Sequence, residues 1–252
     1  MEAVRSTPRL AWLFDIDGTL LLTEGAAREA FASAVHAHFG VEDDLSDIAF
    51  AGRVEPLILA DILAKHRLAM TDGDEARFWN GVFDRMRNLL GPGRGRLLPG
   101  VLPLLDALAL EPAWKLGLLT GNMTEMARIK LDHFGIAGRF AFGAFGEQAS
   151  DRNALARAVV ARVGREHGIG PRRCIVVGDT EHDIACARAA GARVVAVATG
   201  GSRREVLAAF EPDLLLEDLS DAPGLLRWAR GLPDGTRSCG PAPGDRATPY
   251  HR

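Results

Sequence analysis

The stretch LAWLFDIDGTL, residues 10–20, decides the fold, because five apolar residues in it lead directly into two aspartates. An apolar run of this length before Gly18 is typical of a buried strand that ends in a turn. Asp15 and Asp17 then lie at the carboxyl end of that strand, where a buried carboxylate is costly unless something pairs with it. The sequence therefore predicts a buried strand with two carboxylates at its carboxyl end, in a site that contains other charged groups.

Short apolar runs alternate with helix-like stretches from residue 98 onward. The predicted strands are 115–120, 140–145, 174–179, 194–199 and, more weakly, 213–217, and the predicted helices are 122–134, 151–167, 180–190 and 202–209. This alternation indicates a doubly wound parallel sheet, and uniformly apolar strands fit a sheet covered on both faces. We expect the strand at 10–15 to be central, between the strands at 115–120 and 174–178.

Residues 25–92 interrupt this alternation with three predicted helices, at 25–39, 54–66 and 74–90, and the Gly- and Pro-rich segment 91–100 marks a return linker. We therefore expect an α/β fold with an inserted helical cap domain. The predicted parts are a Rossmann-like core from residues 1–22 and 96–230, a helical cap from 23–95, and a disordered tail at 231–252.

The composition excludes several classes of protein. The 252 residues carry a formal net charge of -3, which disfavours a nucleic-acid partner. No apolar run reaches the roughly 18 residues of a membrane span, and the N-terminal MEAVRSTPR lacks the apolar region of a secretory signal. The three cysteines show no metal or disulfide spacing, which favours a cytoplasmic setting. The oligomeric state stays open.

Further polar residues follow the other predicted strands. Thr120-Gly121-Asn122 ends the strand at 115–120, Arg152 begins the helix at 151–167, and Asp179 and Asp183 follow the strand at 174–178. The carboxyl ends of the strands are where ligands bind in open α/β sheets. A carboxylate there can attack phosphorus and form an acyl-phosphate, while a hydroxyl, backbone N–H groups and a cation hold the phosphoryl oxygens.

Three of these elements, D-x-D-G-T-L at residues 15–20, Thr120 at a strand end and G-D-x-x-x-D at residues 178–183, resemble the haloacid dehalogenase-like superfamily of phosphohydrolases. The resemblance covers about residues 10–220. It implies a hydrolase that acts on a small-molecule phosphate ester. In the dehalogenase branch the second carboxylate is generally absent, so Asp17 favours phosphoester hydrolysis.

The resemblance implies roles for the matched residues. Asp15 is the expected nucleophile and Asp17 the expected general acid and base. Mg²⁺ is the expected cofactor, with Asp15, the Asp17 carbonyl, Asp179 and Asp183 as its site. Thr120 is an expected catalytic residue, and Gly121 and Asn122 are expected to bind substrate.

The chain departs from the family at a lysine that usually pairs with the nucleophile and the phosphate. Only Lys65, Lys115 and Lys130 occur, and Lys130 falls inside a helix, a full turn or more from any strand end. We therefore expect Arg152 to replace the missing lysine. The alternative is that Arg152 is a solvated residue of the first helical turn.

The predicted cap contributes a further candidate. The stretch FAGRVEPLIL, residues 50–59, resembles a cap loop that faces the active site in phosphoglycolate-phosphatase-like members, which makes Arg53 a candidate for substrate binding, although a surface arginine is the alternative. Thr23 and Glu24 are further candidates to face the cleft. The alternative functions are a phosphomutase or a dehalogenase of the same fold, or a non-catalytic binding or regulatory protein.

Overall fold

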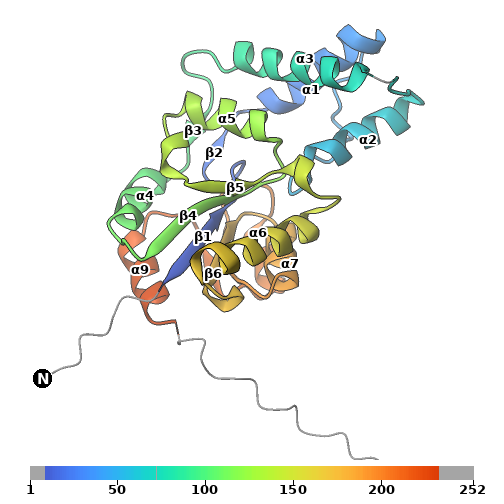
Figure 1. Ribbon diagram of the computed structural model, residues 1–252. Helices are drawn as coiled ribbons and strands as arrows, with labels where there is room; N and C mark the ends of the chain where they lie inside the picture. Colours follow the sequence, from blue (N-terminus) through green and yellow to red (C-terminus); the bar gives the residue numbers. More distant parts are fainter. Residues whose placement is uncertain (1–8, 72, 233–252) are drawn as a thin grey trace, which may run out of the picture.

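The computed structural model describes residues 9–71 and 73–232 and contains a six-stranded parallel sheet (Figure 1). Its central strand, β1 (Leu10–Phe14), pairs with β4 (Trp114–Leu119) on one side and with β6 (Cys174–Gly178) on the other. The order is β5-β4-β1-β6-β7-β8, with β5 at Phe142–Ala144, β7 at Arg193–Val197 and β8 at Leu214–Leu216. The predicted fold class and the central place of the first strand are confirmed.

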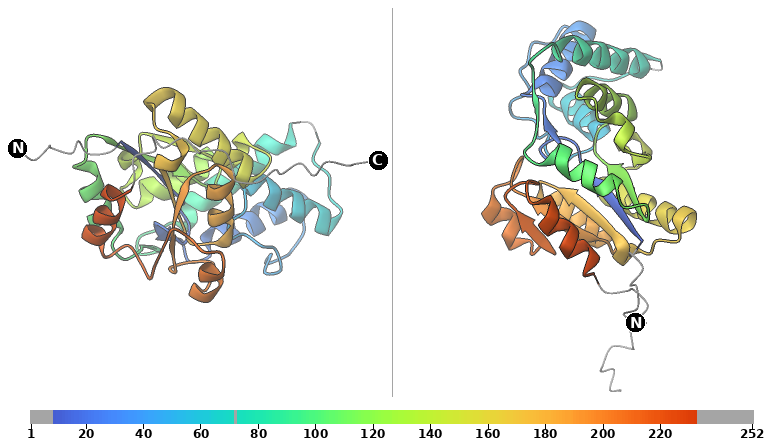
Figure 2. Two further views of the ribbon diagram at one scale, coloured as in Figure 1. Left: turned by 90° about the horizontal axis from the view of Figure 1, so that it is seen from below. Right: turned by 90° about the vertical axis from the view of Figure 1, so that its left-hand side faces the viewer.

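Helices cover both faces of the sheet, and β1 shows why its sequence is apolar throughout. Leu10, Trp12 and Phe14 belong to one core cluster, whereas Ala11 and Leu13 belong to the other. Residues of α4 (Val101–Ala109), α5 (Thr124–His133) and α9 (Ala222–Arg230) complete the first cluster, and residues of α6 (Arg152–His167), α7 (Glu181–Ala189) and α8 (Arg204–Ala209) complete the second. Figure 2 shows α6 and α9 on opposite sides of the sheet.

Helices α4 and α9 are additional to the predicted elements. Both carry a proline in the first turn, Pro103 and Pro223, and α4 follows Gly100 while α9 contains Gly224. Proline near a helix N-terminus is compatible with helix because the N–H groups there lack intrahelical partners. Proline and glycine are also typical of loops, because they often end a helix or a strand. For that reason the sequence pattern alone did not predict these two helices.

A helical insertion lies beyond the carboxyl ends of the strands (Figure 1). It consists of α1 (Ala26–Phe39), α2 (Glu55–His66) and α3 (Asp74–Leu89), as the three helical patterns predicted. The chain leaves and re-enters the core through a two-stranded antiparallel ribbon, β2 (Leu21–Leu22) and β3 (Arg96–Leu97). The predicted return linker at 91–100 thus contains a short strand.

The insertion has its own hydrophobic core, which includes Phe31, Phe78 and Trp79. Met126 and Ile129 of α5 belong to this core of the insertion, while Ala127 and Leu131 of the same helix belong to the sheet cluster that contains Trp12. Helix α5 therefore packs between the sheet and the insertion and is buried on more than one side.

Short 3-10 helices complete the described chain, η1 (Ala137–Arg139), η2 (Gly146–Gln148) and η3 (Pro171–Arg173). Within residues 9–71 and 73–232, no helix is long and apolar enough to cross a membrane. The predicted tail at 231–252 lies outside the described residues except for its first two. The division of the chain into core and cap at residues 23 and 95 stays a prediction.

Candidate active site

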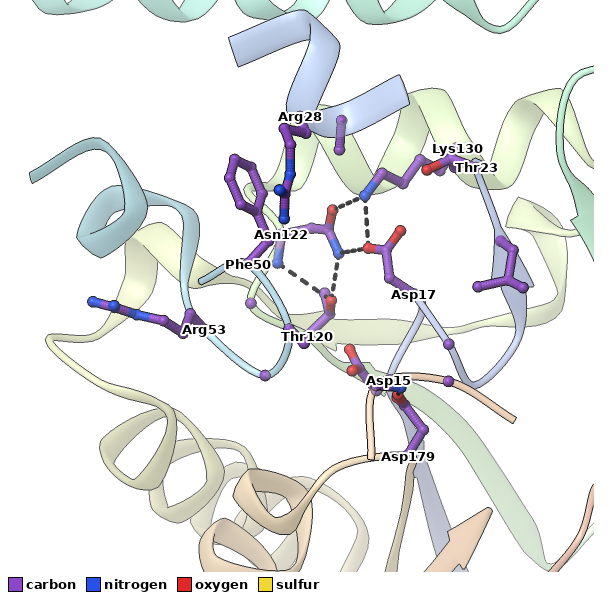
Figure 3. Close-up of a pocket in the computed structure, with 18 of the residues that line it drawn as sticks. Asp15, Asp17, Thr23, Arg28, Phe50, Arg53, Thr120, Asn122, Lys130 and Asp179 are labelled. Carbon is purple, nitrogen blue, oxygen red and sulfur yellow. Dashed lines mark hydrogen bonds and ion pairs between the residues drawn. The ribbon is translucent and has the colours of Figure 1, made fainter. Parts of the chain in front are cut away.

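A pocket of about 550 Å³ lies between the carboxyl ends of the strands and the helical insertion (Figure 3). Both parts of the chain line it, as expected for a ligand site at the switch point of a parallel sheet. Every predicted site residue except Asp183 lines this pocket, and so do Thr23 and Glu24. The predicted residues that line it are Asp15, Asp17, Arg53, Thr120, Gly121, Asn122, Arg152 and Asp179.

Three buried carboxylates meet at the floor of the site. One oxygen from each of Asp15, Asp179 and Asp183 lies within 4.8 Å of the others. Burial raises the pKa of Asp15 and of Asp179, and the neighbouring carboxylates raise both further, because charges of like sign oppose ionisation. Such a cluster is stable as an ionised group only when a cation lies beside it.

Asp179 is held by the turn that follows β1 and by the loop that follows β7. Thr19 Oγ1 donates to Asp179 Oδ1 at 3.0 Å, and the Gly201 N–H donates to Oδ2. Gly18 has φ of +80°, and a Cβ there would lie 2.4 Å from Asp179 Oδ2. Only glycine suits this position, since it tolerates the left-handed backbone and leaves room for the carboxylate.

The Arg152 guanidinium places a positive charge beside this carboxylate cluster. Its Nη2 lies 3.0 Å from Asp15 Oδ2 and also donates to Asp183, and its side chain is 7% exposed. The Asp151 side chain caps α6 through the Ala154 N–H, which fixes the first turn that carries Arg152. Arg152 is therefore not a solvated residue, and its expected replacement of the family lysine stays a prediction.

Asp183 lies deeper than the other two carboxylates. Its Oδ2 accepts hydrogen bonds from the Thr180 N–H at 3.0 Å and the Thr180 hydroxyl at 2.7 Å, while its Oδ1 accepts from Arg152. The carboxylate thus fixes the start of α7 and the Arg152 guanidinium together. Its expected role at a metal site stays a prediction.

The expectation that Lys130 lies away from the site is wrong. Its Nζ lies 2.6 Å from Asp17 Oδ2 and 2.5 Å from Asn122 Oδ1, and its side chain is only 2% exposed. Side chains on a helix lean toward its N-terminus, and α5 begins four residues after Thr120. The long side chain of Lys130 therefore reaches back toward the end of β4, where its ammonium group lies.

A hydrogen-bond network joins the ends of β1 and β4 to α5 (Figure 3). Asn122 Nδ2 donates to Asp17 Oδ2 and to Thr120 Oγ1, both at 2.8 Å. Lys130 and Asn122 thus hold the same oxygen of Asp17, whose side chain is still 41% exposed toward the pocket. Asp17 is oriented by two donors yet accessible to a ligand.

The insertion contacts this network through the segment that contains Arg53. The Arg53 guanidinium pairs with Asp61 of α2 and points away from Asp15 in Figure 3. Its backbone carbonyl packs on the strand end, because a Cβ at Gly121 would lie 1.9 Å from Arg53 O. Substrate binding by the Arg53 side chain stays a prediction.

Sequence analysis missed Glu55, a buried acid of the pocket. Its N–H donates to Gly121 O at 2.9 Å, and its Oε2 accepts from the Met123 N–H at 2.8 Å, so one residue ties the insertion to the core twice. Burial raises the pKa of Glu55 to about 7, although Lys130 and the Met123 N–H oppose the shift. In the sequence it resembles an ordinary acidic first-turn residue beside Pro56.

Comparisons with known proteins find similar sequences and similar folds. A phosphoglycolate phosphatase of Shigella boydii serotype 4 (strain Sb227) is 26% identical over 237 residues, which cover 87% of this chain and 92% of that protein. A crystal structure of a predicted phosphoglycolate phosphatase from Haemophilus somnus superposes with a TM-score of 0.69 at 21% identity, over 88% of this chain and 99% of the other.

A putative β-phosphoglucomutase from Thermotoga maritima has the same fold, with a TM-score of 0.60 at 20% identity over 87% of this chain and 99% of the other. A sequence model of the haloacid dehalogenase-like hydrolases matches residues 11–191, the part of the chain that contains all of β1 except Leu10, the insertion and both aspartate motifs. The protein belongs to the haloacid dehalogenase-like hydrolase family.

Proposed function

We propose that this protein is a Mg²⁺-dependent phosphatase that hydrolyses a small phosphomonoester through an aspartyl-phosphate on Asp15. The observation that carries the proposal is the placement of Asp15 between the Arg152 guanidinium and the Asp179 carboxylate, with Asp17 facing the same pocket. The phosphoglycolate phosphatases among its relatives support a phosphate ester as substrate.

The reaction divides into two displacements at phosphorus. A carboxylate oxygen of Asp15 attacks the phosphorus, the bond to the ester oxygen breaks, and Asp17 gives its proton to that leaving oxygen. Asp17 then removes a proton from a water molecule, whose oxygen attacks the phosphorus of the aspartyl-phosphate. Inorganic phosphate leaves, and the Asp15 carboxylate is restored.

Donors for the phosphoryl oxygens surround Asp15. The Thr120 hydroxyl oxygen accepts hydrogen bonds from the side chain and the N–H of Asn122, at 2.8 and 3.3 Å, so its own proton is available to an anion. Within the described residues, the buried Nε of Arg152 has no hydrogen-bond partner. The Thr120 hydroxyl and the Arg152 guanidinium both belong to residues that line the pocket, and both groups suit an anion that gains charge in the transition state.

The donor set also suits Mg²⁺, which prefers oxygen ligands. Asp15, Asp179 and the Asp17 carbonyl would hold the ion, with Asp183 beside them. Burial and the neighbouring carboxylates raise the pKa of Asp15 and of Asp179, and a bound cation would oppose both effects. When bound, Mg²⁺ would neutralise charge on the transferring phosphoryl group.

The test is release of inorganic phosphate from p-nitrophenyl phosphate and small phosphomonoesters, with Mg²⁺ and with excess chelator. We expect Mg²⁺-dependent release that Asp15→Asn abolishes. The matched control is Asp132→Asn, which removes an exposed carboxylate of α5 that pairs with Arg128. Release unaffected by chelator or by Asp15→Asn would overturn the proposal, and a rearranged phosphate ester without free phosphate would indicate a phosphomutase instead.

A further inference from the structure

The pocket contains five cationic side chains, and four of them have a carboxylate partner. Arg152 pairs with Asp15, Lys130 with Asp17, Arg96 with Glu24 at 3.2 Å, and Arg53 with Asp61. Arg28 is the fifth, and within the described part of the chain no carboxylate lies within 4.0 Å of its guanidinium. Its charge is therefore available to a ligand.

The position of Arg28 is fixed by an aromatic ring. Its Cζ lies 5.1 Å from the centroid of the Phe50 ring, and its Nη2 makes only a long contact of 3.5 Å with Ile48 O. Phe50 in turn makes an edge contact with Phe31 of the insertion core, at 5.5 Å between centroids. A guanidinium on a ring face keeps its N–H edge free for hydrogen bonds.

Arg28 lies on the insertion side of the pocket. In Figure 3 its side chain extends from α1 into the pocket, toward Phe50 and Asn122, whereas Asp15 and Asp179 lie at the opposite side. A substrate whose phosphoryl group lies at Asp15 would direct its alcohol part toward the insertion. That part of the substrate is the one that Arg28 can contact.

We infer that Arg28, held by Phe50, binds a second anionic group on the alcohol part of the substrate, so that the preferred substrates are phosphomonoesters with a carboxylate or a second phosphate. This inference rests on the proposed phosphatase function. The forked N–H donors of arginine match the paired oxygens of either group. An uncharged alcohol part would leave the arginine charge without a partner in a partly desolvated pocket.

The experiment compares substrates that differ only in this group. 2-Phosphoglycolate carries a carboxylate where 2-hydroxyethyl phosphate carries a hydroxymethyl group, and ethane-1,2-diyl bisphosphate carries a second phosphate. We expect the wild-type kcat/KM to be at least 10-fold higher for one of the anionic esters than for 2-hydroxyethyl phosphate. Whichever anionic ester is preferred identifies the group that is bound.

The variant Arg28→Met should lower this ratio at least 10-fold, mainly through KM, and Arg28→Lys should restore part of it. The control is Arg85→Met, which removes an exposed arginine that contacts Ser33 outside this pocket and should leave the ratio unchanged. An equal ratio in wild type and Arg28→Met, or a wild-type preference for the uncharged ester, would overturn the inference.

Binding to Asp15→Asn, measured by titration calorimetry, separates this inference from the proposed function. Tighter binding of an anionic ester that is lost on the further change Arg28→Met supports the subsite even if the wild-type protein releases no phosphate. Hydrolysis of all the esters with no dependence on Arg28 supports the phosphatase and refutes the subsite.

Discussion

Replacing Glu55 by glutamine should stabilise the protein at alkaline pH and leave it unchanged at acidic pH. Glu55 is 5% exposed, and burial raises its pKa to about 7 from 4.5 in an exposed chain. The folded protein therefore holds a proton that the unfolded chain releases between these two values. Because the folded state binds more protons, the free energy of unfolding falls as the pH rises from about 4.5 to about 7.

The size of the effect follows from the shift in pKa. At about 1.4 kcal/mol per pKa unit, a pKa of about 7 against 4.5 lowers the stability by up to about 3 kcal/mol at pH 8. Glutamine has nearly the same shape, keeps an oxygen for the Met123 N–H, and does not ionise. The gain from Glu55→Gln should therefore approach this value at pH 8 and disappear near pH 4.5.

Urea unfolding of both proteins at pH 5 and pH 8, with chelator present, measures the difference. At a typical slope of 1–3 kcal/mol per molar urea, we expect the midpoint of Glu55→Gln to be higher by about 1 M or more at pH 8. The other acids of the pocket are common to both proteins, so their titration cancels in the difference. Glu205→Gln, at an exposed position of α8, is the control. An equal midpoint difference at pH 5 and pH 8, or a less stable Glu55→Gln at pH 8, would refute the reasoning.

The active-site residues lead to three further predictions. With an activated aryl phosphate and rapid quenching, Asp15→Asn should form no phosphoenzyme. Asp17→Asn should accumulate the phosphoenzyme, because an activated leaving group needs little protonation in the first step, whereas the second step still needs a base to activate water. Normal turnover by Asp17→Asn would contradict these roles. Arg152→Ala should lower kcat/KM more than 10-fold, about 1.4 kcal/mol, since it leaves Asp15 without its cation; steady-state kinetics measure this loss, and an unchanged value would exclude a role in binding the anion. Asp179→Asn should raise the Mg²⁺ concentration for half-maximal activity, measured by metal titration, and an unchanged requirement would exclude Asp179 as a ligand.

The sheet was predictable because β1 has no polar residue. Residues 10–14 alternate between two cores and are apolar on both faces, which only a strand covered on both sides requires. The three helices of the insertion were predictable from their helical periodicity. Pattern alone missed α4 and α9 because it cannot tell a proline in a first helical turn from one that ends a helix.

The candidate site was predictable where a residue follows a strand directly, as Asp15, Thr120 and Asp179 do. Lys130 and Glu55 could not be placed in this way, since both reach the pocket from helices. Lys130 occupies a position of α5 that is buried, and an ammonium group is rarely buried without a partner. This was the available signal that Lys130 pairs with an acidic group. Glu55 is buried because the insertion packs against the turn at Gly121, and no local sequence pattern predicts that contact.

Helix α5 sets a limit on how the substrate preference of this protein can change. Met126 and Ile129 complete the hydrophobic core of the insertion, while the same helix carries Lys130 to Asp17. A chimera that exchanges only residues 23–95 for the cap of a relative would place a foreign surface against these two side chains and disturb the helix that orients Asp17. The smallest exchangeable unit therefore includes α5 as well as the insertion.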